Sequence, residues 1–248
     1  MAESIGDELK SFYEFLKYPQ QDIFKEKLSL GNFLPIISTY YIVFICGMIV
    51  LTPFASLAGL DSMPHKLEDL QDMNIWLLLL LAVFTQPFLE EVVFRLPLKY
   101  HRALIVLIFT MIGMIIFMLL GGLYPTVEND TIPPMRIIIP IAAILFASIA
   151  LFLFFNKEDD LLRIRKFVNK YFPHLFYTVA VYFAFVHFFN FETTGNQWLF
   201  TPIMVFPQFL MSLFVGYTRL KYGFLSAVVI HMVNNLLPLM VLQFANPV

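Results

Sequence analysis

The sequence predicts an all-α fold, a polytopic transmembrane helix bundle, and two observations support this prediction. Of the 248 residues, 59% are hydrophobic and only 14% are charged, whereas soluble domains carry about 25% charged residues. The apolar residues also form long unbroken runs, unlike the short alternating strands of a membrane β-barrel. We therefore expect most of this chain to lie outside water.

Seven apolar stretches are long enough for a helix that crosses a bilayer, which takes about 20 residues. They are Phe33–Leu57, Ile75–Phe94, Ala103–Leu123, Ile137–Phe155, His174–Asn190, Trp198–Tyr217 and Phe224–Phe244. Ahead of them, residues 10–28 have the pattern of an amphipathic helix on the membrane surface, with a solvated leader as an equal alternative. We divide the chain into a cytoplasmic or interfacial N-terminal segment, residues 1–32, and a transmembrane bundle, residues 33–248.

The basic residues support this count, because cytoplasmic loops are enriched in Lys and Arg. With seven spans, fourteen of the sixteen basic residues fall on one side, and only Lys66 and Arg136 fall on the other. We therefore expect a cytoplasmic N-terminus and a C-terminus on the opposite side, in the plasma membrane of a prokaryote. The net charge of −2 gives no positive field for nucleic acid, so no nucleic-acid partner is expected.

Ionisable and amide side chains gather on three of the seven spans. Such residues are costly in a bilayer and usually face the protein interior or a water-filled cavity. The cluster comprises Glu90, Glu91, Arg95, His187, Asn190, His231, Asn234 and Asn235. This grouping indicates a functional site rather than scattered polar residues.

Helical spacing distinguishes the two glutamates. Glu91 and Arg95 are four residues apart, so they share a helix face and can form an ion pair. Glu90 points about 100° away from Glu91 and is free to face a cavity. The alternative is that both carboxylates neutralise Arg95 at the membrane surface, which a long Arg side chain can reach.

On the last span, His231 and Asn235 are also four residues apart. Two such donors can stabilise a developing oxyanion, and Asn234 is nearly as well placed. The alternative is hydrogen bonding between helices, and we prefer it for Asn234, Asn190 and Gln86.

His187 lies on an aromatic helix, where a lone histidine is more often a core residue. The presence of Glu90 and His231 on other spans favours a functional role for it. The predicted depths differ: His187 lies about 20 Å into its span and His231 about 10 Å into its own. The span that carries His187 must therefore be strongly tilted, or its cytoplasmic part must extend out of the membrane.

Three motifs now stand in order on three spans. Residues 90–95 fit EExxxR, residues 183–187 fit FxxxH, and residues 231–235 fit HxxxN. In this order the chain resembles the type II CAAX prenyl endopeptidase family, also called the CPBP family (CAAX proteases and bacteriocin-processing enzymes). The resemblance covers about residues 75–244.

The resemblance implies roles for the clustered residues. Glu90 and His187 would activate a water molecule, and His231 and Asn235 would form the oxyanion site. Supporting roles fall to Glu91 and Arg95.

No cofactor is required under this glutamate mechanism, towards which we lean. Some members of the family are described as metalloproteases, and Glu90, His187 and His231 would then bind a zinc ion with one open position. The implied function is an intramembrane endopeptidase. Its partners would be the lipid bilayer and a peptide or protein substrate, prenylated or bacteriocin-like.

Two other functions compete with the protease. A proton- or metal-coupled transporter would use the same ionisable residues, but the sequence has no inverted repeat and no pair of broken helices. A non-catalytic membrane scaffold is the second alternative, and the intact motifs argue against it.

Overall fold

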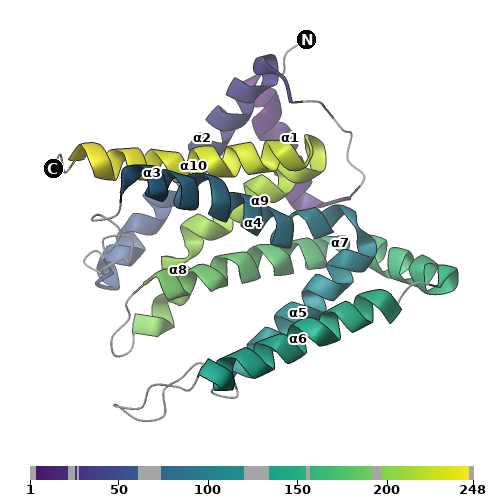
Figure 1. The fold of residues 1–248 in the computed structure, drawn as a ribbon. Coiled ribbons are helices and arrows are strands. Elements are labelled where there is room, and N and C mark those ends of the chain that lie inside the picture. Colours follow the sequence, from purple (N-terminus) through teal and green to yellow (C-terminus); the bar gives the residue numbers. More distant parts are fainter. Residues whose placement is uncertain are drawn as a thin grey trace.

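The computed structural model describes residues 4–21, 26, 28–60, 74–119, 134–154, 157–191 and 197–245, and no β-strand occurs among them. The all-α prediction is therefore confirmed (Figure 1). In chain order the helices are α1 (Ile5–Lys17), α2 (Leu30–Leu57), α3 (Ile75–Leu78), the π-helix η2 (Leu79–Thr85), α4 (Gln86–Phe94), the 3-10 helix η3 (Leu96–Lys99), α5 (His101–Leu119), α6 (Pro134–Phe154), α7 (Glu158–Val186), the 3-10 helices η4 (His187–Asn190) and η5 (Gln197–Phe200), α8 (Thr201–Met204), α9 (Phe206–Lys221) and α10 (Phe224–Ala245). Some predicted features lie outside the described residues: Phe24, Lys25, Lys27, Lys66, residues 120–123 and Phe155.

The structure supports three to four membrane spans by length and composition, where the sequence predicted seven. Three helical stretches qualify alone: Gly31–Leu57, Ile75–Lys99 and Glu158–Asn190. A fourth candidate is a pair of helices, Trp198–Met204 and Phe206–Lys221, bent by 41°. The other three predicted spans match shorter apolar helices within the described residues: His101–Phe117, Ala142–Phe154 and Phe224–Met240.

The N-terminal helix α1 differs from the predicted surface helix at residues 10–28. It begins after Ser4, whose side chain accepts a hydrogen bond from the backbone of Asp7, and it ends at Lys17. Its apolar side packs against the bundle: the ring of Phe12 lies 5.0 Å from that of Phe214, and Phe15 is also buried. Because protein covers this face, a membrane-surface position for α1 is not confirmed.

A buried charge cluster fixes α1 to the turn between α9 and α10. The Lys221 ammonium lies 3.0 Å from Glu8 Oε2, and the Tyr222 hydroxyl donates to the same oxygen at 2.6 Å. Burial, with the hydrogen bond to Glu8, raises the pKa of Tyr222, so the phenol stays a donor. The turn itself needs Gly223, whose φ is +104°, a conformation that L-residues rarely adopt.

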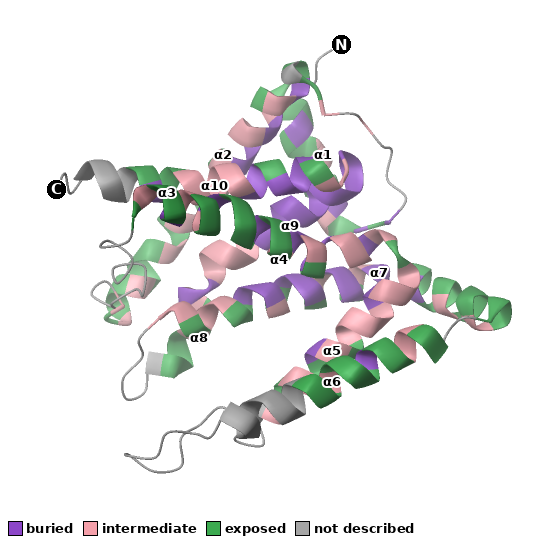
Figure 2. Cartoon of the chain, in the orientation of Figure 1, coloured by how far each residue is buried: buried purple, intermediate pink, exposed green. Residues whose placement is uncertain are grey.

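Helix α9 is the centre of the molecule. All of its residues from Met211 to Lys221 are buried, and α2, α7 and α10 pack around it (Figure 2). Gly216 permits the close approach of α7, since a Cβ atom there would lie 2.7 Å from Phe176. This packing places the end of α7 next to α4 and α10.

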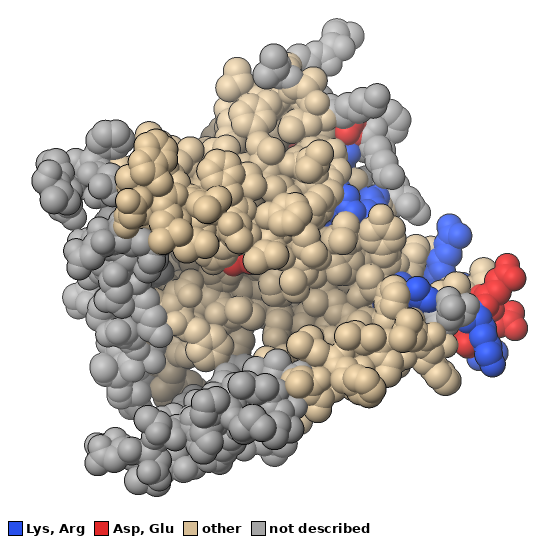
Figure 3. All heavy atoms as spheres, in the orientation of Figure 1, with Lys and Arg blue, Asp and Glu red and all other residues tan. Residues whose placement is uncertain are grey.

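Most of the described surface visible in Figure 3 is uncharged. Figure 3 shows charged side chains gathered near the end of the molecule where α7 begins. Large apolar side chains are exposed along α6, among them Phe146, Ile149 and Leu153. So much exposed apolar area is expected for a chain that meets lipid rather than water.

Candidate functional site

The structure brings together the three ionisable residues that the sequence placed on different spans. Glu90 lies in α4, His187 begins η4 at the end of α7, and His231 lies in α10. The Nε2 atom of His231 is 3.5 Å from Glu90 Oε2, and that of His187 is 3.9 Å from the same oxygen. One carboxylate oxygen therefore faces both imidazoles.

The length of α7 bears on the different depths predicted for His187 and His231 in their spans, because the depth of His187 was measured from the predicted start of its span. The predicted span began at His174, but the helix begins at Glu158 and continues without a break to Val186. Its first half carries most of its charged residues. The fifth predicted span is therefore the second half of a longer helix, and His187 lies at its end.

Arg95 is buried behind the cluster, not at the surface. Its Nε lies 3.6 Å from Glu91 Oε2, which confirms the predicted pair. Its Nη2 donates to Ser212 Oγ of α9 at 3.0 Å, and only 1% of the residue is exposed. The alternative in which Arg95 reaches the membrane surface and is neutralised there by both glutamates is wrong.

Glu91 has a second partner, which the sequence analysis missed. His231 Nδ1 lies 2.8 Å from Glu91 Oε1. An ionised carboxylate can only accept, so Nδ1 carries the proton of this hydrogen bond. Glu91 thereby fixes the orientation of the His231 ring and leaves its Nε2 facing Glu90.

His187 is oriented in a parallel way by Phe183, the first residue of the FxxxH motif. The Phe183 carbonyl lies 2.8 Å from His187 Nδ1 and can only accept, so Nδ1 is again the donor. The Phe183 ring packs 4.6 Å from the His187 ring and lies 3.9 Å from the Arg95 guanidinium carbon. Phe183 therefore joins the buried arginine to the site.

This pattern gives the cluster a defined chemical capacity. The Nδ1 atom of His231 donates to Glu91, and that of His187 donates to the Phe183 carbonyl. In a neutral ring the remaining Nε2 is therefore an acceptor. Glu90 Oε2 has no hydrogen-bond partner among the described residues. A water molecule between these acceptors would donate to Glu90 and to one histidine, which is the arrangement that general-base catalysis needs.

Gln86 belongs to the site, although the sequence analysis assigned it to interhelical bonding. Its Nε2 donates to Glu90 Oε1 at 2.9 Å, so one carboxylate oxygen is held and the other faces the histidines. The signal was present in the sequence, since Gln86 and Glu90 are four residues apart and share a helix face.

Asn235 contacts the π-helix η2. In η2 the backbone bonds run from residue i to i−5, as for Gln86 N–H and the Leu81 carbonyl. The next donor would be Pro87, which has no N–H, so the Ala82 carbonyl loses its backbone partner. Asn235 Nδ2 donates to that carbonyl at 3.0 Å.

Asn234 has the interhelical role that we preferred for it. Its Oδ1 accepts a hydrogen bond from the Tyr40 hydroxyl of α2. Asn190 ends η4, one turn beyond His187.

An apolar cavity of about 270 Å³ is lined by residues of the same helices, α4 and α7, but not by Glu90, His187 or His231. It is bounded by α4, α5 and α7, and its lining includes Phe94 and Val186, the neighbours in sequence of Arg95 and His187. Its lining is suited to an apolar side chain or lipid chain.

Within the described part of the chain, no group of three or more His, Cys, Asp or Glu side chains is arranged to hold a metal ion. Glu90, His187 and His231 are the residues that the resemblance assigned to zinc. Their donor types are those that catalytic zinc uses.

Comparison with family models, curated proteins and solved structures gave no match for this chain. A functional assignment therefore rests on the three motifs and on the geometry of the cluster.

Proposed function

We propose that this chain is an intramembrane endopeptidase of the CAAX type, which hydrolyses a peptide bond of a membrane-associated substrate. One observation carries the proposal: Glu90 Oε2 faces the Nε2 atoms of both His187 and His231, at 3.9 and 3.5 Å. The side chain of Glu90 is 18% exposed, whereas Glu91 behind it is fully buried. Glu90 is thus the less buried of the two carboxylates.

In the proposed reaction, Glu90 takes a proton from a water molecule that His187 also binds. The water oxygen attacks the carbonyl carbon of the substrate and forms a tetrahedral oxyanion. Glu90 then returns the proton to the leaving nitrogen as the peptide bond breaks. Gln86 holds the other oxygen of Glu90 throughout this transfer.

The oxyanion requires donors, and His231 serves when its Nε2 is protonated. Glu91, bonded to Nδ1, stabilises the positive imidazolium, as a carboxylate does behind a catalytic histidine. Asn235 supplies a second donor with the amide hydrogen that it does not use on Ala82. A zinc ion held by Glu90, His187 and His231 would instead supply a Lewis acid.

The substrate proposed is a peptide or protein at the membrane, prenylated or bacteriocin-like. The resemblance supports this class, and so does the apolar cavity that residues of α4 and α7 line. The proposal includes seven membrane crossings and a cytoplasmic N-terminus, in the plasma membrane of a prokaryote.

The test compares peptide termini in membranes from cells that express wild type, Glu90→Gln or Glu158→Gln at matched levels. Glu158 is an exposed acid at the start of α7 and provides the control. We expect new termini, detected by mass spectrometry, with wild type and Glu158→Gln but not with Glu90→Gln. A loss of about a hundredfold or more is expected, since general-base catalysis contributes that much.

Two results would contradict the proposal. Termini that persist with Glu90→Gln would remove Glu90 as the base. Termini that do not differ between wild type and empty vector would remove the protease assignment, and proton or metal flux would be measured next.

A further inference from the structure

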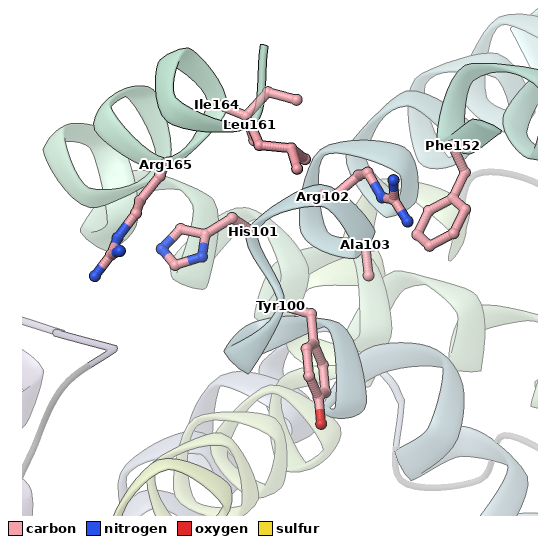
Figure 4. A pocket seen from close by; sticks show the side chains of 8 residues that line it. All are labelled: Tyr100, His101, Arg102, Ala103, Phe152, Leu161, Ile164 and Arg165. Atoms are coloured by element: carbon pink, nitrogen blue, oxygen red, sulfur yellow. The ribbon is translucent and has the colours of Figure 1, made fainter. Parts of the chain in front are cut away.

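A second cavity, of about 460 Å³, lies where α5 begins, α6 ends and α7 begins (Figure 4). It shares no lining residue with the Glu–His cluster. Its position at the ends of two apolar helices is notable, because phospholipid headgroups meet a membrane protein at the ends of its apolar segments.

The polar part of the lining is basic. Apart from Tyr100, it consists of Arg102 and His101 at the start of α5 and of Arg165 on α7. In Figure 4, His101 lies between Arg165 and Arg102, and the guanidinium of Arg165 points away from Arg102. The acidic residues of α7 are in its first turn and are not part of this lining. The cavity therefore favours an anion.

Two contacts orient these basic groups. The Arg102 guanidinium carbon lies 3.8 Å from the centre of the Phe152 ring, which fixes the plane of its donor groups. The Nε2 atom of His101 bonds Asn169 Oδ1 at 2.9 Å. Planar guanidinium groups bind phosphate oxygens through paired hydrogen bonds.

The rest of the lining is apolar. Phe152, Leu161 and Ile164 contribute to it, and the exposed apolar face of α6 continues from Phe152 through Ile149. A free phosphate ion gains no free energy from contact with an apolar surface, whereas lipid acyl chains do, because they bury apolar area there. The lining thus suits an anionic headgroup that is attached to lipid chains.

We propose that this cavity binds the phosphate headgroup of an anionic phospholipid, with the acyl chains along the exposed face of α6. Arg102 and Arg165 supply the positive charge of the site. Basic pockets between helices at the cytoplasmic surface are suited to such headgroups. The inference does not depend on the proposed protease activity.

The test measures lipid binding to the full-length protein in detergent, by native mass spectrometry and by the lipid-dependent shift of the unfolding temperature. The ligands are phosphatidylglycerol, phosphatidylcholine and inorganic phosphate. The variant is Arg165→Gln, and the matched control is Arg163→Gln, an exposed arginine of the same helix that does not line the cavity.

We expect wild type and Arg163→Gln to bind phosphatidylglycerol equally, and Arg165→Gln to bind it about fivefold more weakly. Phosphatidylcholine and inorganic phosphate should leave the unfolding temperature of wild type unchanged. Equal affinity of Arg165→Gln and Arg163→Gln would overturn the site. A shift with phosphate alone would overturn the lipid as ligand, and equal binding of phosphatidylcholine would overturn the role of charge.

Both arginines are exposed, so neither substitution should affect folding. The unfolding temperature without lipid checks this. The comparison of the three ligands on wild type tests the proposal even if a variant is unstable.

Discussion

Glu90 and Glu91 are neighbours in sequence, and both contact His231, but they do so at different ring nitrogens and their other partners differ. Glu91 is fully buried, accepts a hydrogen bond from His231 Nδ1 and forms an ion pair with Arg95. Glu90 accepts from Gln86 and turns its second oxygen towards the two histidines. The rotation of about 100° between successive helical residues produces this division. One carboxylate organises the site, and the other is available for chemistry.

The division predicts that Glu91 contributes more than Glu90 to stability, whereas Glu90 is required for the proposed activity. Glu91→Gln leaves the buried Arg95 guanidinium without its counter-charge, and breaking such a pair costs about 3–5 kcal/mol. Glu90→Gln, at a partly exposed position, is expected to cost about 1 kcal/mol while it abolishes the proposed activity. The free energies of unfolding of both variants, measured in a detergent titration, test these two costs.

The Arg95→Lys variant extends this comparison. It keeps the charge but loses the planar group that lies over Phe183 and bonds Ser212. If Glu91→Gln were no more destabilising than Glu90→Gln, the buried pair would not hold the site together.

At the scale of secondary structure, the π-helix η2 and α10 depend on each other. The wider turn of η2 leaves the Ala82 carbonyl opposite Pro87, which has no N–H, and Asn235 of α10 supplies the missing donor. Proline is tolerated in apolar helices when a neighbouring helix bonds the freed group in this way. Asn235 therefore helps to position the helix that carries Glu90.

A double-mutant cycle tests this dependence. Asn235→Ala alone should cost about 1–3 kcal/mol, because the Ala82 carbonyl becomes unsatisfied. In the Pro87→Ala background the backbone N–H of residue 87 can bond that carbonyl, so the same substitution should cost less. We expect a coupling energy on the order of 1 kcal/mol between the two sites. Additive effects would contradict the role assigned to Asn235 in stability.

The sequence predicted a helix well where the evidence for it is the composition of that segment alone. The predicted span Phe33–Leu57 matches α2, Leu30–Leu57, because a long apolar run needs no tertiary information. The π-helix η2 and the break at Val205 between α8 and α9 were not predicted. Both interrupt apolar runs, so hydropathy alone contains no signal for them, although a proline that suggests a kink follows each break, Pro87 and Pro207.

The same limit applies to the candidate site. Spacing within one helix predicted the Glu91–Arg95 pair, and the same rule would have identified Gln86 as a partner of Glu90. Contacts between helices, such as His231 with Glu91, depend on how the helices are packed. Ordered motifs indicated that three helices meet, but not which atoms face each other.

At the scale of the whole molecule, α5 and α6 are, with α10, the predicted spans that do not qualify as membrane crossings by length in the described part of the chain. Helices α5 and α6 form a packed pair, and their apolar parts are shorter within the described residues than the other candidate spans. The positive-inside rule nevertheless predicts that the chain crosses the membrane an even number of times between Arg102 and Lys157. A pair that crosses twice and a pair that stays on one side both satisfy this.

Cysteine labelling in intact cells separates these two arrangements. In a Cys46→Ala background, Asn129→Cys probes the segment between α5 and α6, and Glu158→Cys probes the start of α7. If all seven stretches cross, a membrane-impermeant thiol reagent should label Asn129→Cys directly and label Glu158→Cys only after the membrane is permeabilised. Protection of both would mean that α5 and α6 stay on the cytoplasmic side, and labelling of Glu158→Cys in intact cells would invert the orientation.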